Sequence, residues 1–138
     1  MLEENKAIAR RMCDEFWITG QFNGGDDLLG SDFVYHRTGD EESLDREGYK
    51  QDVMDYVNSF TDVQATFEDL VAEGDKVAVR YTWTGRHTGE FMGAPPTGKL
   101  IIFRLITILR IVDGKVVEEW EGSDMLDLER QLGLIPAE

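Results

Sequence analysis

The stretch KLIIFRLITILRIVDGKVVEEWEGSDMLDLERQLG, residues 99–133, decides the fold of this chain. It holds a long apolar run (100–112), the pair Asp113-Gly114 and a second run (116–120) that is half apolar. An Asp-Gly pair between two such runs predicts a β-hairpin, because a type I′ turn needs positive φ at both central residues. We therefore expect two long antiparallel strands here.

The hairpin turn also predicts which side chains share a face of the sheet. If Val112 pairs with Lys115, then Phe103 faces Asp124, and Trp120 lies on their side of the sheet because side chains alternate along a strand. A carboxylate on an apolar face is costly unless it is paired, protonated or functional. This register makes Asp124 a candidate site residue.

Length and composition bound the class of protein. The 138 residues predict a single domain over 1–138, and the net charge of −14 argues against nucleic acid or an anionic membrane as a partner. Cys13 is the single cysteine, so an intrachain disulfide is ruled out. No apolar run reaches the ~20 residues of a membrane span, and we see no signal peptide, so we expect a cytoplasmic protein.

The other segments alternate between helical and strand periodicity. Apolar side chains recur at helical spacing in three segments and at every second position in the central part of the chain. The expected elements are a helix over 3–19, a short helical turn over 24–31, a strand over 33–36, a helix over 45–60 capped by Ser43 or Asp45, a hairpin from 62 to 83 that turns at 73–75, a loop over 89–98, and a helix over 125–132 that stops at Gly133.

This order predicts an α+β layer design, in which N-terminal helices pack on a curved antiparallel sheet. The space between the helices and the concave face can form a pocket. The strand over 100–112 is apolar on both parities, so we expect both of its faces to be covered. One face would line the pocket, and the other would contact a second subunit in a homodimer or homotetramer.

Three motifs carry a resemblance to a known family. The segments HTGEFMGAPPTGK (87–99), FRLITILRIVDGKVVEEW (103–120) and DMLDLERQLG (124–133) resemble the SnoaL-like polyketide cyclase family of the NTF2-like superfamily. The resemblance implies a cone-shaped, cystatin-like fold and an ester cyclase that needs no cofactor and takes a hydrophobic small molecule. It also implies an acid/base aspartate at the position of Asp124.

Ring closure by aldol addition needs a base that removes a proton next to a carbonyl group and an acid that protonates the resulting alkoxide. One carboxyl group serves both steps if its pKa is raised toward neutrality, which an apolar wall of Phe103, Leu105 and Trp120 would do for Asp124. A second interpretation makes Asp124 the N-cap of the helix that starts at Met125.

The two histidines are the other candidates for catalysis. His87 lies in the family-like motif and His36 at the end of an early strand, and each is also compatible with a structural role. Their separation and the lack of HxxxH spacing predict no metal site. The residues expected to line the substrate pocket, with ordinary strand core as the alternative for the first two, are Tyr81, Trp83, Phe16, Phe103, Leu105 and Trp120.

The fold alone does not select one activity. The same architecture supports isomerases, epoxide hydrolases and proteins that bind small molecules without turnover. These activities remain alternatives to the cyclase at this stage.

Overall fold

A computed structural model describes residues 1–20, 28–37, 39 and 42–136 of the chain. Its strands are β1 (Leu29–His36), β2 (Phe60–Glu73), β3 (Lys76–His87), β4 (Leu100–Val112) and β5 (Lys115–Ser123). They form one five-stranded sheet in the order β1-β5-β4-β3-β2. All neighbours are antiparallel except β1 and β5, which run parallel.

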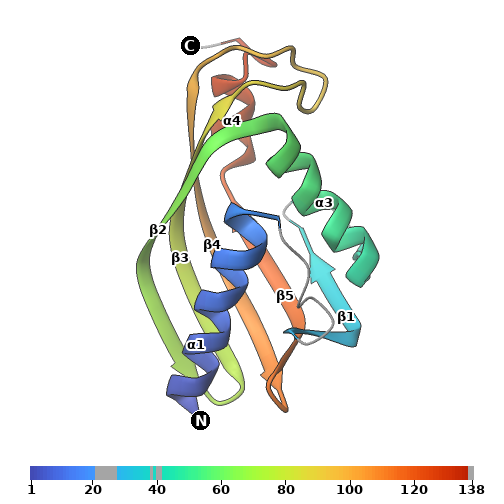
Figure 1. Ribbon diagram of the computed structural model, residues 1–138, viewed down its shortest axis with the longest axis vertical. Coiled ribbons are helices and arrows are strands. Elements are labelled where there is room, and N and C mark those ends of the chain that lie inside the picture. Colours follow the sequence, from blue (N-terminus) through green and yellow to red (C-terminus); the bar gives the residue numbers. More distant parts are fainter. Residues whose placement is uncertain (21–27, 38, 40–41, 137–138) are drawn as a thin grey trace.

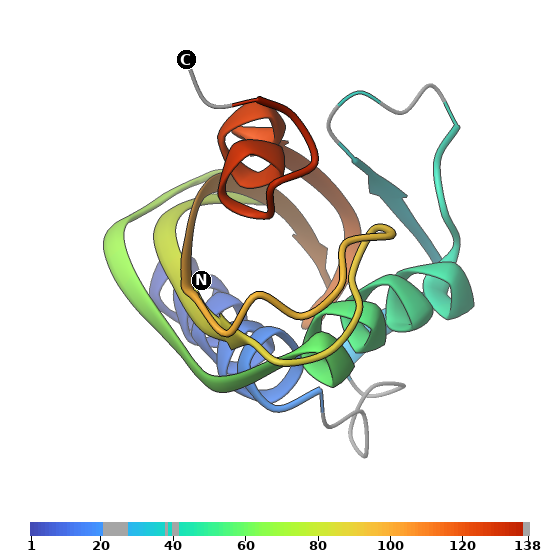
Figure 2. The ribbon, with the colours of Figure 1, turned by 90° about the horizontal axis from the view of Figure 1, so that it is seen from above.

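The helices are α1 (Leu2–Met12), which continues as the π-helix η1 (Cys13–Ile18), then α3 (Arg46–Ser59) and α4 (Met125–Gln131). Figure 1 shows α1 and α3 in front of the curved sheet, and Figure 2 shows the sheet curling around the space that they close. This is the predicted α+β cone. Among the described residues, no helix is long and apolar enough to span a bilayer.

Local sequence signals fix the ends of several elements as predicted. Asp45 caps α3, and its carboxylate accepts a hydrogen bond from the Gly48 backbone N–H at 2.8 Å. At the tip of the last hairpin, Asp113 and Gly114 have φ values of 51° and 76°, as a type I′ turn requires. Gly133, with φ of 79°, follows the C-terminal helix.

The core lies between the concave face of the sheet and the helices α1 and α3. Met12 and Phe16 of the first helical segment are fully buried there, opposite inward residues of the central strands. On β4 the inward parity is Ile101, Phe103, Leu105, Thr107, Leu109 and Ile111, all of them buried. The opposite parity of β4 carries apolar side chains that are exposed.

The predicted register of the last hairpin is wrong beyond its turn. Pairing begins as expected, with Ile111 opposite Val116, but a β-bulge follows and Arg110 then pairs with Glu118. One extra residue on β5, Val117, breaks the alternation, so every later side chain moves to the opposite face of the sheet.

The early strand also differs from expectation. β1 begins at Leu29, so residues 29–31 are strand, where we expected the end of a helical turn. Half of that predicted turn, residues 24–27, lies outside the described residues. Parallel pairing of β1 with β5 places Tyr35 beside Glu119 and His36 beside Trp120.

Candidate active site

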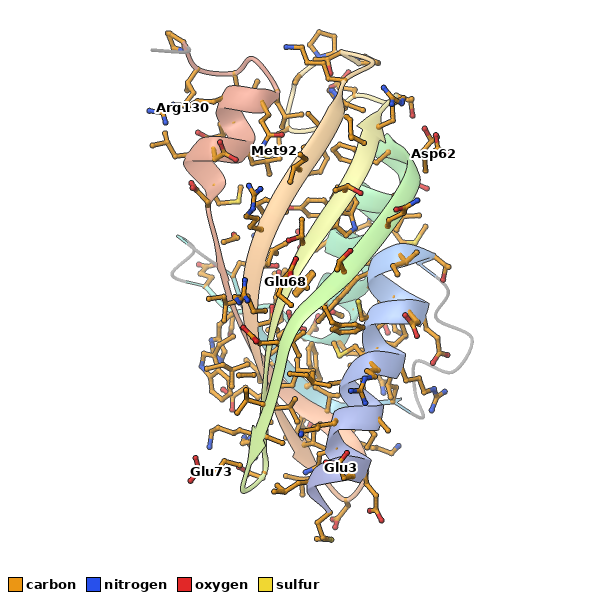
Figure 3. The ribbon with its side chains drawn as sticks, turned by 90° about the vertical axis from the view of Figure 1, so that its left-hand side faces the viewer. Glu3, Asp62, Glu68, Glu73, Met92 and Arg130 are labelled. Carbon is orange, nitrogen blue, oxygen red and sulfur yellow. The ribbon has the colours of Figure 1, made fainter. Side chains whose placement is uncertain are left out.

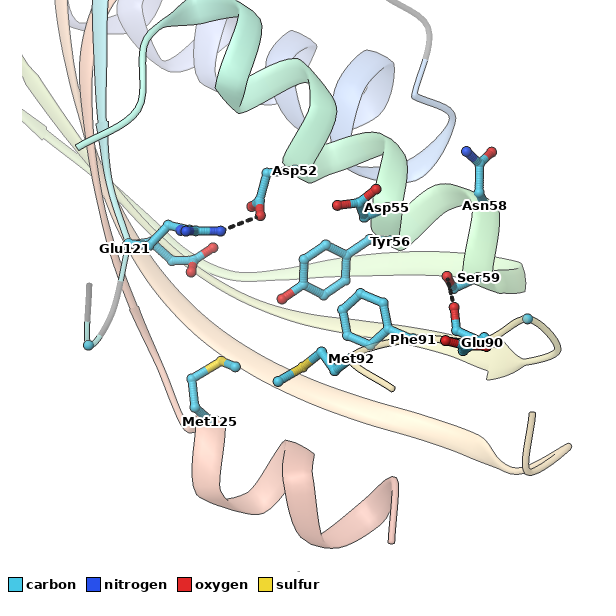
Figure 4. Close-up of a pocket in the computed structure, with 13 residues that line it drawn as sticks. Asp52, Asp55, Tyr56, Asn58, Ser59, Glu90, Phe91, Met92, Glu121 and Met125 are labelled. Atoms are coloured by element: carbon cyan, nitrogen blue, oxygen red, sulfur yellow. Dashed lines mark hydrogen bonds and ion pairs between the residues drawn. The ribbon is translucent and has the colours of Figure 1, made fainter. Parts of the chain in front are cut away.

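Two connected chambers lie inside the cone, between α3, the sheet and the loop after β3. The outer chamber has a volume of about 650 Å³, and the inner one about 50 Å³. Asp52, Tyr56 and Glu121 line both, so they stand where the chambers meet. Figure 4 shows Asp52 of α3 and Glu121 of β5 facing each other across the opening, with the Tyr56 ring beside them.

The opening between the chambers is built from acids and their hydrogen-bond partners. The Arg37 Nη1 donates to the Asp52 Oδ1 at 2.8 Å. The Tyr35 hydroxyl carries one hydrogen and is placed to donate it to Asp52 or to Glu121, which favours the charged form of the acid that accepts it. Arg37 and Tyr35 thus supply the hydrogen-bond donors for two carboxyl groups at the entrance to the inner chamber.

Burial shifts the proton affinity of these acids. It raises the pKa of Glu121 to about 7, and the hydrogen bond from Tyr35 opposes the shift only in part. The pKa of Asp52 is also raised, chiefly by burial, while Arg37 acts in the other direction. Glu121 therefore changes its protonation state near neutral pH.

The inner chamber holds a third acid, Glu119, which is 1% exposed. Its carboxyl group forms a hydrogen bond with the Tyr49 side chain, and Trp17 Nε1 donates to the Tyr49 hydroxyl oxygen at 2.6 Å. Trp83 Nε1 in turn donates to the Trp17 carbonyl oxygen at 2.9 Å. Burial and the nearby charge of Glu121 raise the pKa of Glu119 well above its usual range.

Several residues expected in the pocket wall are found there. Tyr81, Trp83, Phe103 and Leu105 all line the inner chamber, and Tyr81 stacks on Trp17 with ring centroids 4.6 Å apart. Their contact with a substrate stays a prediction. Phe16 belongs to the buried core and does not belong to either chamber wall.

Asp124 does not lie on the apolar face where the sequence placed it. It is exposed and caps α4, and its Oδ1 accepts a hydrogen bond from the Asp127 backbone N–H at 3.0 Å. It borders a shallow depression on the outer face of the sheet, together with Arg104 and Ser123. The geometry is that of the second interpretation, the helix cap.

The two histidines are outside both chamber walls. His36 stacks on Trp120 with centroids 5.5 Å apart, and its Nε2 is 2.7 Å from a Glu118 carboxylate oxygen on the outer face. Trp120 therefore leaves the predicted apolar wall for the same reason as Asp124, the β5 bulge. His87 is fully buried, and its Nδ1 accepts from the Thr97 backbone N–H at 3.2 Å.

The sequence did not predict the β5 carboxyl groups that face the chambers, Glu119 and Glu121, because the bulge has no signal in the strand alternation. One signal was available in the sequence. The run Glu118–Glu121 carries acids on both parities, so at least one of them faces inward in any register. Among the described residues, no three side chains of the types His, Cys, Asp and Glu are grouped so as to hold a metal ion.

Chambers lined by acids and apolar side chains inside a hollow cone form the candidate site, and comparisons with known proteins show the family to which the chain belongs. The model of the SnoaL-like polyketide cyclase family matches residues 7–132. The aklanonic acid methyl ester cyclase AcmA of Streptomyces galilaeus is 30% identical over 134 residues, covering 96% of this chain and 92% of that protein.

The nogalonic acid methyl ester cyclase of Streptomyces nogalater is 34% identical over 79 residues, covering 51% of this chain and 59% of that protein. The crystal structure of AclR from Streptomyces galilaeus, which is described as a hydroxylase, has a TM-score of 0.87 at 31% identity, covering 100% of this chain and 86% of that one. This chain belongs to the SnoaL-like polyketide cyclase family.

Proposed function

We propose that this protein is a cofactor-independent cyclase that closes a ring within a neutral, largely apolar carbonyl substrate, with Glu121 as the acid/base group. The observation that carries the proposal is the position of this carboxyl group at the junction of the chambers, with a pKa of about 7. A single group that both takes and returns a proton works best with a pKa near the ambient pH.

In the proposed reaction, the Glu121 carboxylate removes a proton from the carbon next to a carbonyl group. The electron pair of that C–H bond forms a C–C bond to a second carbonyl carbon, whose π electrons move to its oxygen. Protonated Glu121 then returns the proton to this alkoxide. Substrate and product are isomers, so the step needs no co-reactant.

The charge around the outer chamber favours an ester over a free acid. Among the described residues, Asp52, Asp55, Glu90 and Glu121 line it together with one cation, Arg37, which already pairs with Asp52. A substrate carboxylate would meet net negative charge there, whereas a methyl ester would not. Two relatives are named as methyl ester cyclases, which supports a polyketide methyl ester as the substrate class.

The proposal is tested with aklanonic acid methyl ester and nogalonic acid methyl ester as probes. The product is expected to have the mass of the substrate and a different retention time. Glu121→Gln should lower kcat by about 10²–10⁴, the usual contribution of a general acid/base. The matched control is Asp124→Asn on the outer face, which should keep kcat within a few-fold of the wild type.

The same pair of variants separates Glu121 from the aspartate favoured by family resemblance. Loss of turnover in folded Asp124→Asn, with turnover kept in Glu121→Gln, would return the acid/base role to Asp124. Solvent deuterium exchange at the probe carbon without ring closure would indicate an isomerase-type activity. Tight binding of a probe with neither exchange nor turnover would indicate a binding protein.

A further inference from the structure

Glu119 is a buried acid that takes no part in the proposed proton transfer. It is 1% exposed, it lines the inner chamber, and its Oε1 atom is buried with no hydrogen-bond partner among the described residues. Buried polar atoms are nearly always paired, because an unpaired one loses its hydrogen bonds to water and gains none within the protein. An orphaned carboxyl oxygen in a chamber wall therefore points to a ligand atom as its partner.

The surroundings of Glu119 favour its neutral form. The titratable groups that face it are Tyr35 on β1, Tyr49 and Asp52 on α3, Tyr81 on β3 and Glu121 on its own strand. The acids Asp52 and Glu121 both raise its pKa, in the same direction as burial. A protonated carboxyl group carries one O–H donor, which an ionised one lacks.

A chain of hydrogen bonds fixes the orientation of this carboxyl group. Trp17 Nε1 donates to the Tyr49 hydroxyl oxygen, so the Tyr49 hydrogen is left for Glu119. The carboxyl group thus accepts from Tyr49 on one side. Its free Oε1 is the atom available to hold the proton and to donate it as a hydrogen bond to a ligand.

The spacing between Glu119 and Glu121 suits one carbonyl unit. The two residues are two positions apart on β5 and face the same side, so their Cα atoms are ~7 Å apart. A carbonyl oxygen and the carbon beside the carbonyl carbon are separated by two bonds. A ligand that accepts from Glu119 through its oxygen can therefore bring that neighbouring carbon to Glu121.

We propose that Glu119 is the hydrogen-bond donor of the inner chamber, and that its protonated carboxyl group binds the carbonyl oxygen of the ligand. During proton removal by Glu121, negative charge develops on this same oxygen, and the donor stabilises it. No proton is transferred from Glu119, which returns unchanged. The role in ring closure rests on the proposed function, whereas the binding of a carbonyl group does not.

The binding step is tested with acetophenone labelled with ¹³C at its carbonyl carbon, a neutral aromatic ketone. A hydrogen bond to the oxygen moves the carbonyl ¹³C signal downfield. The bound signal is expected downfield in the wild type and in Glu119→Gln, whose amide also donates. In Glu119→Met, which fills a similar volume without a donor, the shift should be lost.

Two further readouts separate this inference from a structural role and from the cyclase proposal. With the methyl ester probes, Glu119→Met should lose about 10²–10³ in kcat, as when an oxyanion donor is removed, and Glu119→Gln should lose much less. Infrared spectra at pH 8 should show the carbonyl band of a protonated carboxyl group in the wild type and in Glu121→Gln, but not in Glu119→Gln.

The proposal is overturned if acetophenone does not bind at millimolar concentration, or if its bound signal is the same in all three proteins. A carboxylate band of Glu119 at pH 8 would also overturn it. If the ¹³C and infrared results hold but no probe is turned over, the cyclase proposal fails and the donor site stands. Circular dichroism checks that each variant is folded.

Discussion

Asp52, Glu119 and Glu121 are acids whose ionisation is opposed by burial, and a fold alone gains nothing from such a placement. Each has a raised pKa because the cone removes it from water. Nearby like charges reinforce the effect, from Asp55 on Asp52 and from Asp52 on both glutamates. Perturbed acids grouped at a cavity are typical of functional sites. At the scale of single residues, the site can therefore be recognised by buried acids whose ionisation lowers the stability of the folded state.

The effect of ionisation on stability gives a prediction for Glu121. Its pKa is about 7 in the folded state against an ordinary value of 4.5, so the folded state binds the proton more tightly than the unfolded state. The resulting stabilisation is complete below about pH 4.5 and is lost as the pH rises through about 7. Glu121→Gln, which cannot ionise, should be more stable than the wild type at pH 8, by up to about 3 kcal/mol.

Urea unfolding of the wild type and Glu121→Gln at pH 4.5 and at pH 8 measures this difference. The gap in free energy of unfolding should be large at pH 8 and should shrink at pH 4.5. Glu4→Gln, at an exposed position of α1, serves as the matched control and should show a small gap that does not change. A Glu121→Gln variant that is less stable than the wild type at pH 8 would contradict the assignment.

The same ionisation sets the pH dependence of turnover. A carboxylate base is active only when deprotonated, so kcat/KM should rise with pH and level off above about 7. Rates on a methyl ester probe between pH 5 and pH 9 measure this profile. A rate that is flat across that range would show that a group other than Glu121 limits proton removal.

At the scale of elements, the sequence predicted more of the fold than of the site. The Asp113-Gly114 turn, the alternation along β2 and β3, and the cap at Asp45 are local signals, and each element formed where its signal lay. The bulge at Val117 has no such local signal. After the bulge, β5 pairs in parallel with β1, a strand that is distant in sequence.

One displaced residue therefore decides the whole site. Without the bulge, Trp120 and Asp124 would face inward; with it, Glu119 and Glu121 do. The inward acids find hydrogen-bond partners in Tyr35 and Tyr49, which come from segments about 70 residues or more earlier in the chain. Reasoning from strand alternation fails where tertiary contacts of this kind set the register.

The C-terminal helix gives a prediction at this scale. α4 is short, and Gln131 fastens it to β4: its Oε1 accepts from the Ile102 N–H at 2.8 Å, and its Nε2 donates to the Ile102 carbonyl at 2.7 Å. Gln131→Ala should lower the free energy of unfolding by about 1–3 kcal/mol, because both backbone groups lose their partner. Chemical denaturation measures the loss.

Arg130→Ala is the control for Gln131→Ala, since Arg130 is exposed on the same helix and its replacement should cost far less. Equal costs for the two variants would show that helix propensity dominates and that the hydrogen bonds to Ile102 contribute little.

At the scale of the whole molecule, the outward face of the sheet remains to be explained. Figure 3 shows this face beside the β2 edge, with Glu68 pointing away from α1. On β4 the outward side chains Leu100, Ile106, Ile108 and Val112 are 38–52% exposed and form an apolar stripe that Arg104 and Arg110 interrupt. Exposed apolar side chains gathered on one face are typical of an interaction surface.

We expect a second copy of the chain to cover this stripe. Acidic and basic side chains, among them Glu68, Asp69 and Arg80, flank it on β2 and β3, and Arg104 lies within it on β4. A twofold axis through the stripe would place apolar side chains against their own copies and bring basic positions near acidic ones, as isologous interfaces do. Sedimentation at micromolar concentration should therefore give a dimer or a tetramer.

Ile106→Lys should weaken this association, because two buried ammonium groups would face each other across the axis. The control is Leu2→Lys, at an exposed apolar position of α1 on the far side of the sheet, which should leave the assembly intact. A wild-type protein that sediments only as a monomer would contradict the proposed interface. Because the chambers open on the opposite side of the sheet, turnover per chain should be the same in the Ile106→Lys monomer.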